Sequence, residues 1–148
     1  MKALLVDGFN LVRRIYAAVP QPADDALPLA KEAHVHGVIS SMNASLQRAL
    51  RAHSPSHCVV VFEQPGRTWR HRLHPEYKIK RSAMPEPLAR NMDTIKKNFA
   101  DIGVNSFEFV GYEADDVIAT MATKIAAVSY THLPSPRDRQ KSRMPSSA

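Results

Sequence analysis

Three short apolar runs, each followed by a carboxylate, are separated by longer segments with helical periodicity. Residues 3–6 lead to Asp7, residues 58–62 lead to Glu63, and residues 104–110 lead to an acidic cluster. The first two runs are continuously apolar, as is typical of strands buried on both faces of a parallel sheet, and residues 104–110, which mix apolar and polar residues, are expected to form a third strand. Helices between such strands supply the crossover connections. The alternation therefore predicts an α/β fold with an open parallel sheet.

Four segments have apolar residues recurring at the spacing of an amphipathic helix. Helices are expected over residues 10–18, 29–52 and 86–101, and a fourth is expected to begin near Glu113. The residues expected to face inward are Leu11, Ile15 and Val19; Val35, Val38, Ile39, Met42, Leu46 and Leu50; Leu88, Met92, Ile95 and Phe99; and Val117, Ile118, Met121 and Ile125. Residues 64–84 have no clean period and are rich in basic residues.

Length and composition limit the class of protein. The 148 residues predict one folded domain, and a composition that is 44% hydrophobic and 23% charged is typical of a soluble globular protein. No apolar run approaches the length of a membrane span, and the chain becomes acidic too early for a signal peptide. The single cysteine, Cys58, cannot form an intramolecular disulfide, which is typical of a reducing compartment. We therefore expect a cytoplasmic protein without a membrane partner.

Residues 128–148 differ from the rest of the chain. The helical period stops near Val128, and the following Pro/Ser/Arg-rich sequence is expected to be disordered. It holds half of the formal charge of +6, so it could be a nucleic-acid-binding arm. Residues 134–148, however, resemble a translated sequencing adapter, and we favour a non-native tail. The folded part is expected to span residues 1–127.

The carboxylates that follow the predicted strands are expected to meet at one edge of the sheet, because sites in open α/β sheets form outside the carboxyl ends of the strands. They are Asp7, Glu63, Glu113, Asp115 and Asp116. Taken singly, each has a structural explanation, since acids commonly occupy turns and first helical turns. Gathered without a counterion, they would repel one another. A hard divalent cation such as magnesium removes that repulsion and acts in phosphoryl chemistry.

Residues 67–97 are strongly basic, with nine Lys and Arg residues against three Asp and Glu residues. The rings of Trp69, His71, His74 and Tyr77 lie among these charges. A charge run is often only a solvated surface. Cations that offset phosphates, together with rings that stack on bases, are what a single-stranded nucleic-acid site needs. We expect binding that depends on nucleic-acid structure rather than on base sequence.

Three spaced motifs resemble those of the 5′-nuclease family. Residues 5–14 (LVDGFNLVRR) resemble its first motif, residues 69–85 resemble its helical-arch region through WRHR, PEYK and MP, and residues 113–116 (EADD) match its central acidic motif. The family includes the 5′-3′ exonuclease domain of bacterial DNA polymerase I and small free-standing flap endonucleases. The likeness covers residues 1–127 and implies a Rossmann-like, PIN-like sheet with a helical-arch insertion.

The resemblance also implies roles for individual residues. A divalent ion, magnesium or manganese in its place, would be bound by Asp7, Glu63, Glu113, Asp115 and Asp116, although Glu63 stands where the family usually has Asp. DNA with 5′ flaps or 5′ ends would be bound by Arg70, Arg72, Tyr77, Lys78, Lys80 and Arg81. Of these, Lys78 and Arg81 would act at the scissile phosphate. The implied reaction is metal-dependent hydrolysis of a phosphodiester.

Members of the family continue beyond the acidic helix into a strand with an Asp pair for a second metal, and then into a helix-hairpin-helix that grips duplex DNA. Neither part is found in this sequence. The fold is therefore expected to be truncated, and this chain is expected to cleave DNA weakly or not at all.

Two other interpretations stay open. A PIN-type ribonuclease shares the fold and the acidic edge but normally lacks a long basic arch, and a non-catalytic nucleic-acid-binding module would explain the basic residues alone. A phosphatase with an Asp nucleophile is disfavoured because Phe9 stands where a second Asp is needed. His34 and His36 point to different sides of a predicted helix, so no zinc site is expected there.

Overall fold

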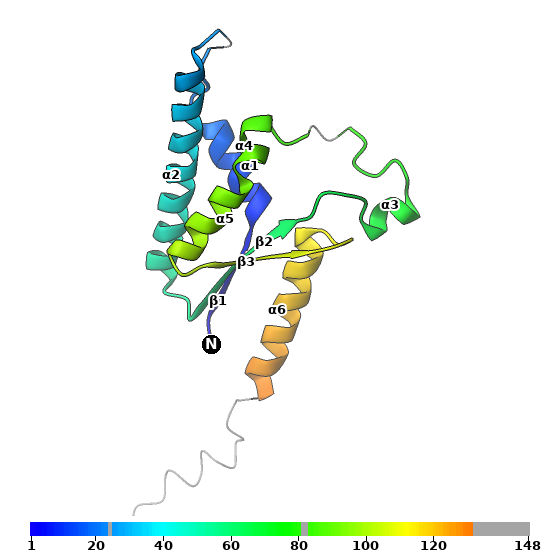
Figure 1. Cartoon of the computed structure of the whole chain (residues 1–148). Coiled ribbons are helices and arrows are strands. Elements are labelled where there is room, and N and C mark those ends of the chain that lie inside the picture. The colour runs from blue at the N-terminus through cyan, green and yellow to red at the C-terminus, as the bar shows by residue number, and fades with distance from the viewer. Residues whose placement is uncertain (24, 81–82, 132–148) are drawn as a thin grey trace, which may run out of the picture.

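The structure is a computed structural model and describes residues 1–23, 25–80 and 83–131. The strands and helices of this part, in chain order, are β1 (Ala3–Asp7), α1 (Gly8–Ala18), α2 (Pro28–His53), β2 (His57–Glu63), α3 (Trp69–Leu73), α4 (Glu86–Arg90), α5 (Met92–Asp101), β3 (Asn105–Phe109) and α6 (Ala114–Thr131). The strands form a parallel sheet in the order β1-β2-β3 (Figure 1). The predicted α/β class with an open parallel sheet is confirmed.

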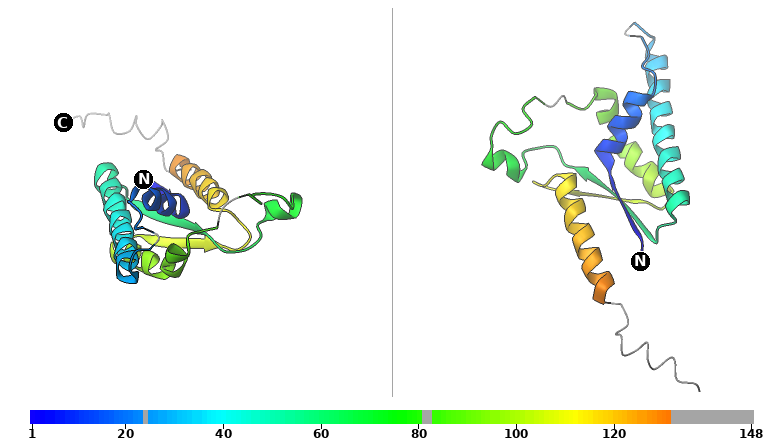
Figure 2. Two further views of the ribbon diagram at one scale, coloured as in Figure 1. Left: turned by 90° about the horizontal axis from the view of Figure 1, so that it is seen from above. Right: turned by 180° about the vertical axis from the view of Figure 1, so that it is seen from behind.

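The register of the sheet brings the carboxyl ends of its strands to one edge, the carboxyl edge. Asp7 pairs with Val61 across β1 and β2, and Glu63 pairs with Phe109 across β2 and β3. Helices α1, α2, α4 and α5 contribute to one buried core, while α6 packs against β1 and β2. The view from above in Figure 2 shows α6 across the sheet from α4 and α5. The sheet is therefore covered on both faces.

The core is organised around Phe62, which is 1% exposed at the end of β2. The ring of Phe9 meets it edge-on at a centroid distance of 5.4 Å, and the ring of Phe99 stacks on it at 6.4 Å. Helix α1 begins directly against this ring, since a Cβ built on Gly8 would lie only 2.4 Å from Phe62 Cε1. Glycine is therefore required at the first residue of α1 by close approach.

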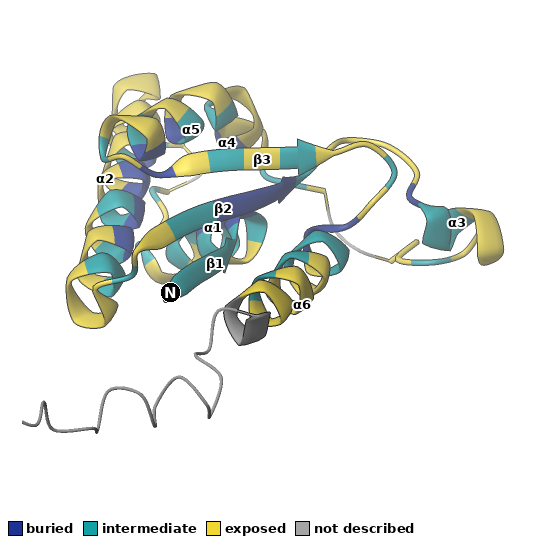
Figure 3. Ribbon diagram, turned by 90° about the horizontal axis from the view of Figure 1, so that it is seen from below, coloured by how far each residue is buried: buried dark blue, intermediate teal, exposed yellow. Residues whose placement is uncertain are grey.

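Most residues expected to face inward do so. In α2 five of the six residues predicted to form the buried side are buried and Leu50 is partly buried, and Leu88, Ile95 and Phe99 are buried in α4 and α5 (Figure 3). Met92 and the four predicted residues of α6, Val117, Ile118, Met121 and Ile125, are partly buried. Helix α1 differs, because Val12 is its fully buried apolar side chain, whereas Leu11 and Ile15 are only partly buried. The apolar stripe of α1 is therefore rotated by one residue from the predicted one.

The helix predicted over residues 86–101 is two helices. Asn91 separates α4 from α5 with φ −104° and ψ 9°. Its backbone N–H donates to Leu88 O, and its side-chain Nδ2 donates to Pro87 O at 2.8 Å. Asparagine side chains compete in this way with the helical hydrogen bonds, so the apolar period continues through a break in the backbone.

Helix α6 was expected to lose its period near Val128, but it continues to Thr131. Ser, Tyr and Thr have only modestly lower helix propensity than leucine, and Pro134 restricts mainly the residue before it and the turn preceding it. Composition therefore indicated a boundary a few residues too early. The predicted disordered tail lies, beyond Thr131, outside the described residues.

The β3 side of the sheet is less covered than the β1 side. Burial alternates along β3, and Phe107 and Phe109 are 43% and 49% exposed. Among the described strands, β3 pairs only with β2. Within the described residues, no helix is both long enough and apolar enough to cross a bilayer.

Candidate functional site at the carboxyl edge

Asp7 ends β1 and caps α1. Its Oδ1 accepts a hydrogen bond from the backbone N–H of Asn10 at 2.9 Å. This bond satisfies one of the donors that the first helical turn leaves unpaired. Asp7 therefore has a structural role of the kind that a lone acid after a strand commonly has, and that role fixes its carboxylate at the carboxyl edge.

The acidic motif forms the start of α6. Gly111, with φ +79°, turns the chain after β3, and Glu113 directly precedes the first helical residue. Asp116 Oδ2 accepts a hydrogen bond from the backbone N–H of Glu113 at 3.2 Å, which is one half of a capping box. Glu113 is only 4% exposed, whereas Asp115 is exposed. The three acids of one helical turn thus lie in three different environments.

Asp116 is bound by two neighbouring side chains of α3. Arg70 Nη1 and Nη2 donate to its two carboxylate oxygens at 2.5 and 2.7 Å, and Trp69 Nε1 donates to Oδ2 at 3.0 Å. Such a bidentate pair is among the strong, charge-assisted hydrogen bonds. The bond from Arg70 lowers the pKa of Asp116 to about 2, although partial burial opposes the shift. The same bond raises the pKa of Arg70.

Glu113 is bound by the segment that follows α3. Lys78 Nζ lies 3.0 Å from Oε1, and the hydroxyl of Tyr77 donates to Oε2 at 3.2 Å. Arg70 Nη1 lies 3.5 Å from the same Oε2. Hydrogen-bonding and cationic partners of this kind offset the cost of burying a carboxylate so deeply. Together these contacts tie residues 69–78 to the start of α6.

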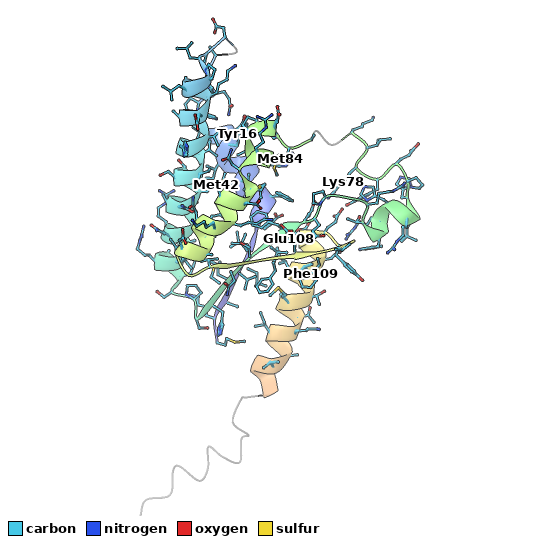
Figure 4. All side chains as sticks on the ribbon, viewed as in Figure 1. Tyr16, Met42, Lys78, Met84, Glu108 and Phe109 are labelled. Atoms are coloured by element: carbon cyan, nitrogen blue, oxygen red, sulfur yellow. The ribbon has the colours of Figure 1, made fainter. Side chains whose placement is uncertain are left out.

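Lys78 has a strained backbone. Its φ of +57° lies in the left-handed region, which costs a side chain without special local bonding roughly 1 kcal/mol or more. Its Nζ lies between two acids, 3.0 Å from Glu113 and 3.9 Å from Glu63. Figure 4 places Lys78 between α3 and α4, on the side of the molecule where α6 begins. The two ion pairs offset the strain and fix the lysine at the carboxyl edge.

The part of the chain around Lys78 is called the arch segment here, comprising residues 64–80 and 83–85. It leaves the end of β2, extends away from the sheet and returns to α4 (Figure 1). Besides the side-chain bonds, the backbone N–H of Trp69 donates to Gly111 O at 3.0 Å. The arch segment is therefore fastened to the β3–α6 turn through both backbone and side chains.

An open cavity of about 330 Å³ lies at the carboxyl edge. Its lining residues are Asp7, Asn10, Arg13, Arg14, Glu63, Lys78 and Asp115. Arg13 and Arg14 were not among the site residues expected from the sequence. The available signal was their spacing, since they follow Asn10 by three and four positions and so share a helix face with it. Carboxylates from β1, β2 and α6 thus line one cavity together with cations from α1 and the arch segment.

The acids do not form a metal site as arranged. Their oxygens are hard donors of the kind that magnesium or manganese prefers. Yet across residues 1–23, 25–80 and 83–131 no three His, Cys, Asp or Glu side chains lie close enough to hold one ion. Asp116 and Glu113 instead meet Arg70, Lys78, Trp69 and Tyr77. The donor chemistry suits a divalent cation, but the arrangement of these side chains does not.

The predicted DNA-binding residues lie along the arch segment. Arg70, Tyr77 and Lys78 contact the acidic motif, whereas Arg72 and Lys80 are exposed. Arg81 lies outside the described residues. The acids and part of the basic segment thus lie together at one edge, and the role of these cations in binding DNA stays a prediction. Their pairing with the acids does not follow from the sequence pattern.

Three comparisons bear on this arrangement. The family model for the 5′-3′ exonuclease N-terminal resolvase-like domain matches residues 2–140. The chain is 38% identical over 125 residues to the flap endonuclease Xni of Shewanella oneidensis, covering 84% of this chain and 44% of that protein. It is 41% identical over 123 residues to the Xni of Psychromonas ingrahamii, covering 83% and 45%. The chain therefore spans less than half the length of these relatives.

Solved structures show the same fold. The T5 5′-exonuclease with bound zinc matches with a TM-score of 0.56 at 20% identity, over 85% of this chain and 45% of that one. The T5 flap endonuclease in a pseudo-enzyme-product complex with DNA and metal ions matches with a TM-score of 0.52 at 18% identity, over 86% and 46%. The family resemblance inferred from the three motifs is confirmed, and the chain belongs to the 5′-3′ exonuclease family, of which it carries the N-terminal resolvase-like domain.

Proposed function

We propose that this chain is the N-terminal part of a 5′ nuclease that hydrolyses DNA phosphodiesters at 5′ flaps or 5′ ends. The observation that carries the proposal is the contact between its two functional motifs. The basic arch segment lies against the acidic motif at the carboxyl edge, through the bonds of Arg70 and Lys78 to Asp116 and Glu113. Its relatives in Shewanella and Psychromonas are flap endonucleases.

The arch segment supplies the residues that would hold a DNA strand. Lys78 and Arg70 lie beside the acids where a phosphodiester would meet them, and Arg72 and Lys80 are exposed further along the segment. The ring of Trp69 and the ring of Tyr77 stand among these cations, with Arg70 Cζ 4.5 Å and 6.0 Å from their centroids. Cations that offset phosphates and rings that stack on bases favour a single strand without reading its sequence.

Dependence on a divalent cation is part of the proposal. Its support is the donor chemistry of Asp7, Glu63, Glu113, Asp115 and Asp116, and the metal ions in the solved T5 relatives. Magnesium, or manganese in its place, is the expected ion. The cytoplasm is the expected location, given the single cysteine.

The test is cleavage of a 5′-flap DNA duplex in magnesium and in EDTA. We expect the 148-residue chain to cut weakly or not at all, and a longer form with its natural downstream sequence to cut only with the divalent ion. In the longer form, Asp115→Asn should abolish cleavage and retain binding, because Asp115 lines the cavity without a described tie to the arch segment. Cleavage that persists in EDTA would contradict the proposal.

A non-catalytic nucleic-acid-binding module is the second candidate. It is favoured by one observation, that Asp116 and Glu113 are neutralised by cations within the chain rather than gathered around a metal. It predicts that the longer form binds flap DNA but does not cut it in magnesium or manganese. A PIN-type ribonuclease would instead prefer single-stranded RNA over flap DNA in the same assay.

A further inference from the structure

The arch segment satisfies the acidic motif with its own donors. Asp116 receives both ends of the Arg70 guanidinium and the indole N–H of Trp69. Glu113 receives Lys78 Nζ and the Tyr77 hydroxyl. The acids therefore have cationic partners before any external ion is added.

These contacts are not passing surface pairs. The side chains of Arg70 and Asp116 are only 26% and 20% exposed, and that of Glu113 is 5% exposed. The fork of Arg70 uses both oxygens of Asp116, and its hydrogen bond holds the pKa of Asp116 well below the usual range. An ion that needs an oxygen of Asp116 must therefore displace a charge-assisted bond.

We infer that Arg70 is an internal counterion that competes with a divalent cation for Asp116, so that metal binding and release of the arch segment are coupled. The inference rests on the proposed function, since it takes the divalent ion from there. A DNA strand that draws Arg70 to its phosphates frees Asp116. By thermodynamic reciprocity, DNA then raises the affinity for the ion, and the ion raises the affinity for DNA.

Trp69 provides a direct reporter of this exchange. It is the only tryptophan of the chain; its Nε1 donates to Asp116 and its ring carries the Arg70 guanidinium at 4.5 Å. Loss of the Arg70–Asp116 contact removes both an indole hydrogen bond and a stacked cation. Its fluorescence therefore reports the local event without reference to cleavage.

The experiment titrates the metal-free 148-residue chain with Mg²⁺, and separately with Mn²⁺, while Trp69 emission and its quenching by acrylamide are recorded. Arg70→Gln keeps a donor of similar reach but removes the charge and the fork. We expect roughly tenfold less ion at half-saturation in Arg70→Gln, the scale that losing one charge-assisted pair implies. Arg70→Lys keeps the charge but cannot bind both carboxylate oxygens at once, so its half-saturating ion concentration should lie between those of the unaltered chain and Arg70→Gln. It also serves as the test variant if Arg70→Gln does not fold.

Arg90→Gln is the matched control. Arg90 is paired with Glu86 within α4 and is largely exposed, so its removal changes the net charge by the same amount away from the site. It should leave half-saturation unchanged. A single-stranded oligonucleotide should lower the half-saturating ion concentration of the unaltered chain, because its phosphates draw Arg70 away from Asp116. In Arg70→Gln the oligonucleotide should lower that concentration much less.

The outcomes separate this inference from the proposed function. Equal half-saturation in the unaltered chain and both Arg70 variants, or no response of Trp69 to either ion, overturns the competition, while cleavage by the longer form can still stand. Tighter binding in Arg70→Gln together with a longer form that never cuts supports the competition and overturns the nuclease.

Discussion

The Lys78–Glu113 pair should contribute measurably to stability, and a double-mutant cycle isolates that contribution. Lys78→Met removes the ammonium and keeps the chain length, and Glu113→Gln removes the charge and keeps the shape. The lysine side chain is 30% exposed and the glutamate side chain 5% exposed, at an N–O distance of 3.0 Å. Removal of the lysine alone leaves a buried carboxylate with less compensation, so the single variant should be destabilised by about 2 kcal/mol.

A second ion pair in the same chain provides the matched control. Lys96 and Glu108 join α5 to β3, with side-chain exposures of 29% and 25%. The two lysines are similarly exposed, whereas the carboxylate of Glu113 is more deeply buried and has additional partners in Tyr77 and Arg70. We expect a coupling energy of about 1–2 kcal/mol for Lys78 and Glu113. For Lys96→Met and Glu108→Gln we expect about 0.5 kcal/mol or less, as for exposed pairs.

The assay is urea unfolding followed by far-ultraviolet circular dichroism, with linear extrapolation of the free energy of unfolding. Circular dichroism is preferable to fluorescence because the sole tryptophan, Trp69, lies at the altered site. Equal coupling in the two cycles would refute the argument that burial of Glu113 makes its ion pair strong. A coupling near zero for Lys78 and Glu113 would show in addition that these contacts do not hold the arch segment.

Other predictions concern the charge of Asp116 and the packing around α1. Because the pKa of Asp116 is lowered from 3.8 to about 2 in the folded chain, its contribution is present above pH 4 and is lost as the pH falls toward 2. Screening at this partly exposed pair limits it to about 1 kcal/mol, and Asp116→Asn should remove this pH dependence from urea unfolding. Gly8→Ala should destabilise the fold by about 1–3 kcal/mol, because the added Cβ overlaps the Phe62 ring. Gly37→Ala in α2 should stabilise it by about 0.5–1 kcal/mol, because a Cβ there has nothing within 4 Å. Thermal unfolding measures both, and melting temperatures that shift in the same direction would contradict the packing argument.

Periodicity was sufficient for the fold because the sheet is simple. Helical segments separate the predicted strands, and each strand pairs with its neighbour in chain order. The positions of Asp7, Glu63 and the acidic motif at one edge therefore follow from local pattern alone. The break at Asn91 did not follow, since it depends on a side-chain hydrogen bond to Pro87 O that leaves the apolar spacing intact.

The partners of the acids could not be predicted from the sequence. Arg70 and Asp116 are 46 positions apart, and their contact depends on how an aperiodic segment folds back on the β3–α6 turn. Lys78 has a left-handed backbone, and its Nζ lies against Glu113. This conformation could not be predicted, because the residue is not a glycine or asparagine, the types that usually adopt it. Sequence identified which residue types gather at the edge, while tertiary contacts decided which of them bind one another.

The cap formed by Asp7 has a practical consequence for the choice of substitutions. Replacing it with alanine removes a charge and also removes the acceptor for the Asn10 N–H in the first turn of α1, which destabilises the helix by about 1 kcal/mol. Helix α1 also carries Arg13 and Arg14, which line the cavity. Loss of activity in Asp7→Ala could therefore not be assigned to the missing carboxylate rather than to a displaced helix. Asparagine caps as well as aspartate does, so Asp7→Asn alters the electrostatics and leaves the scaffold in place.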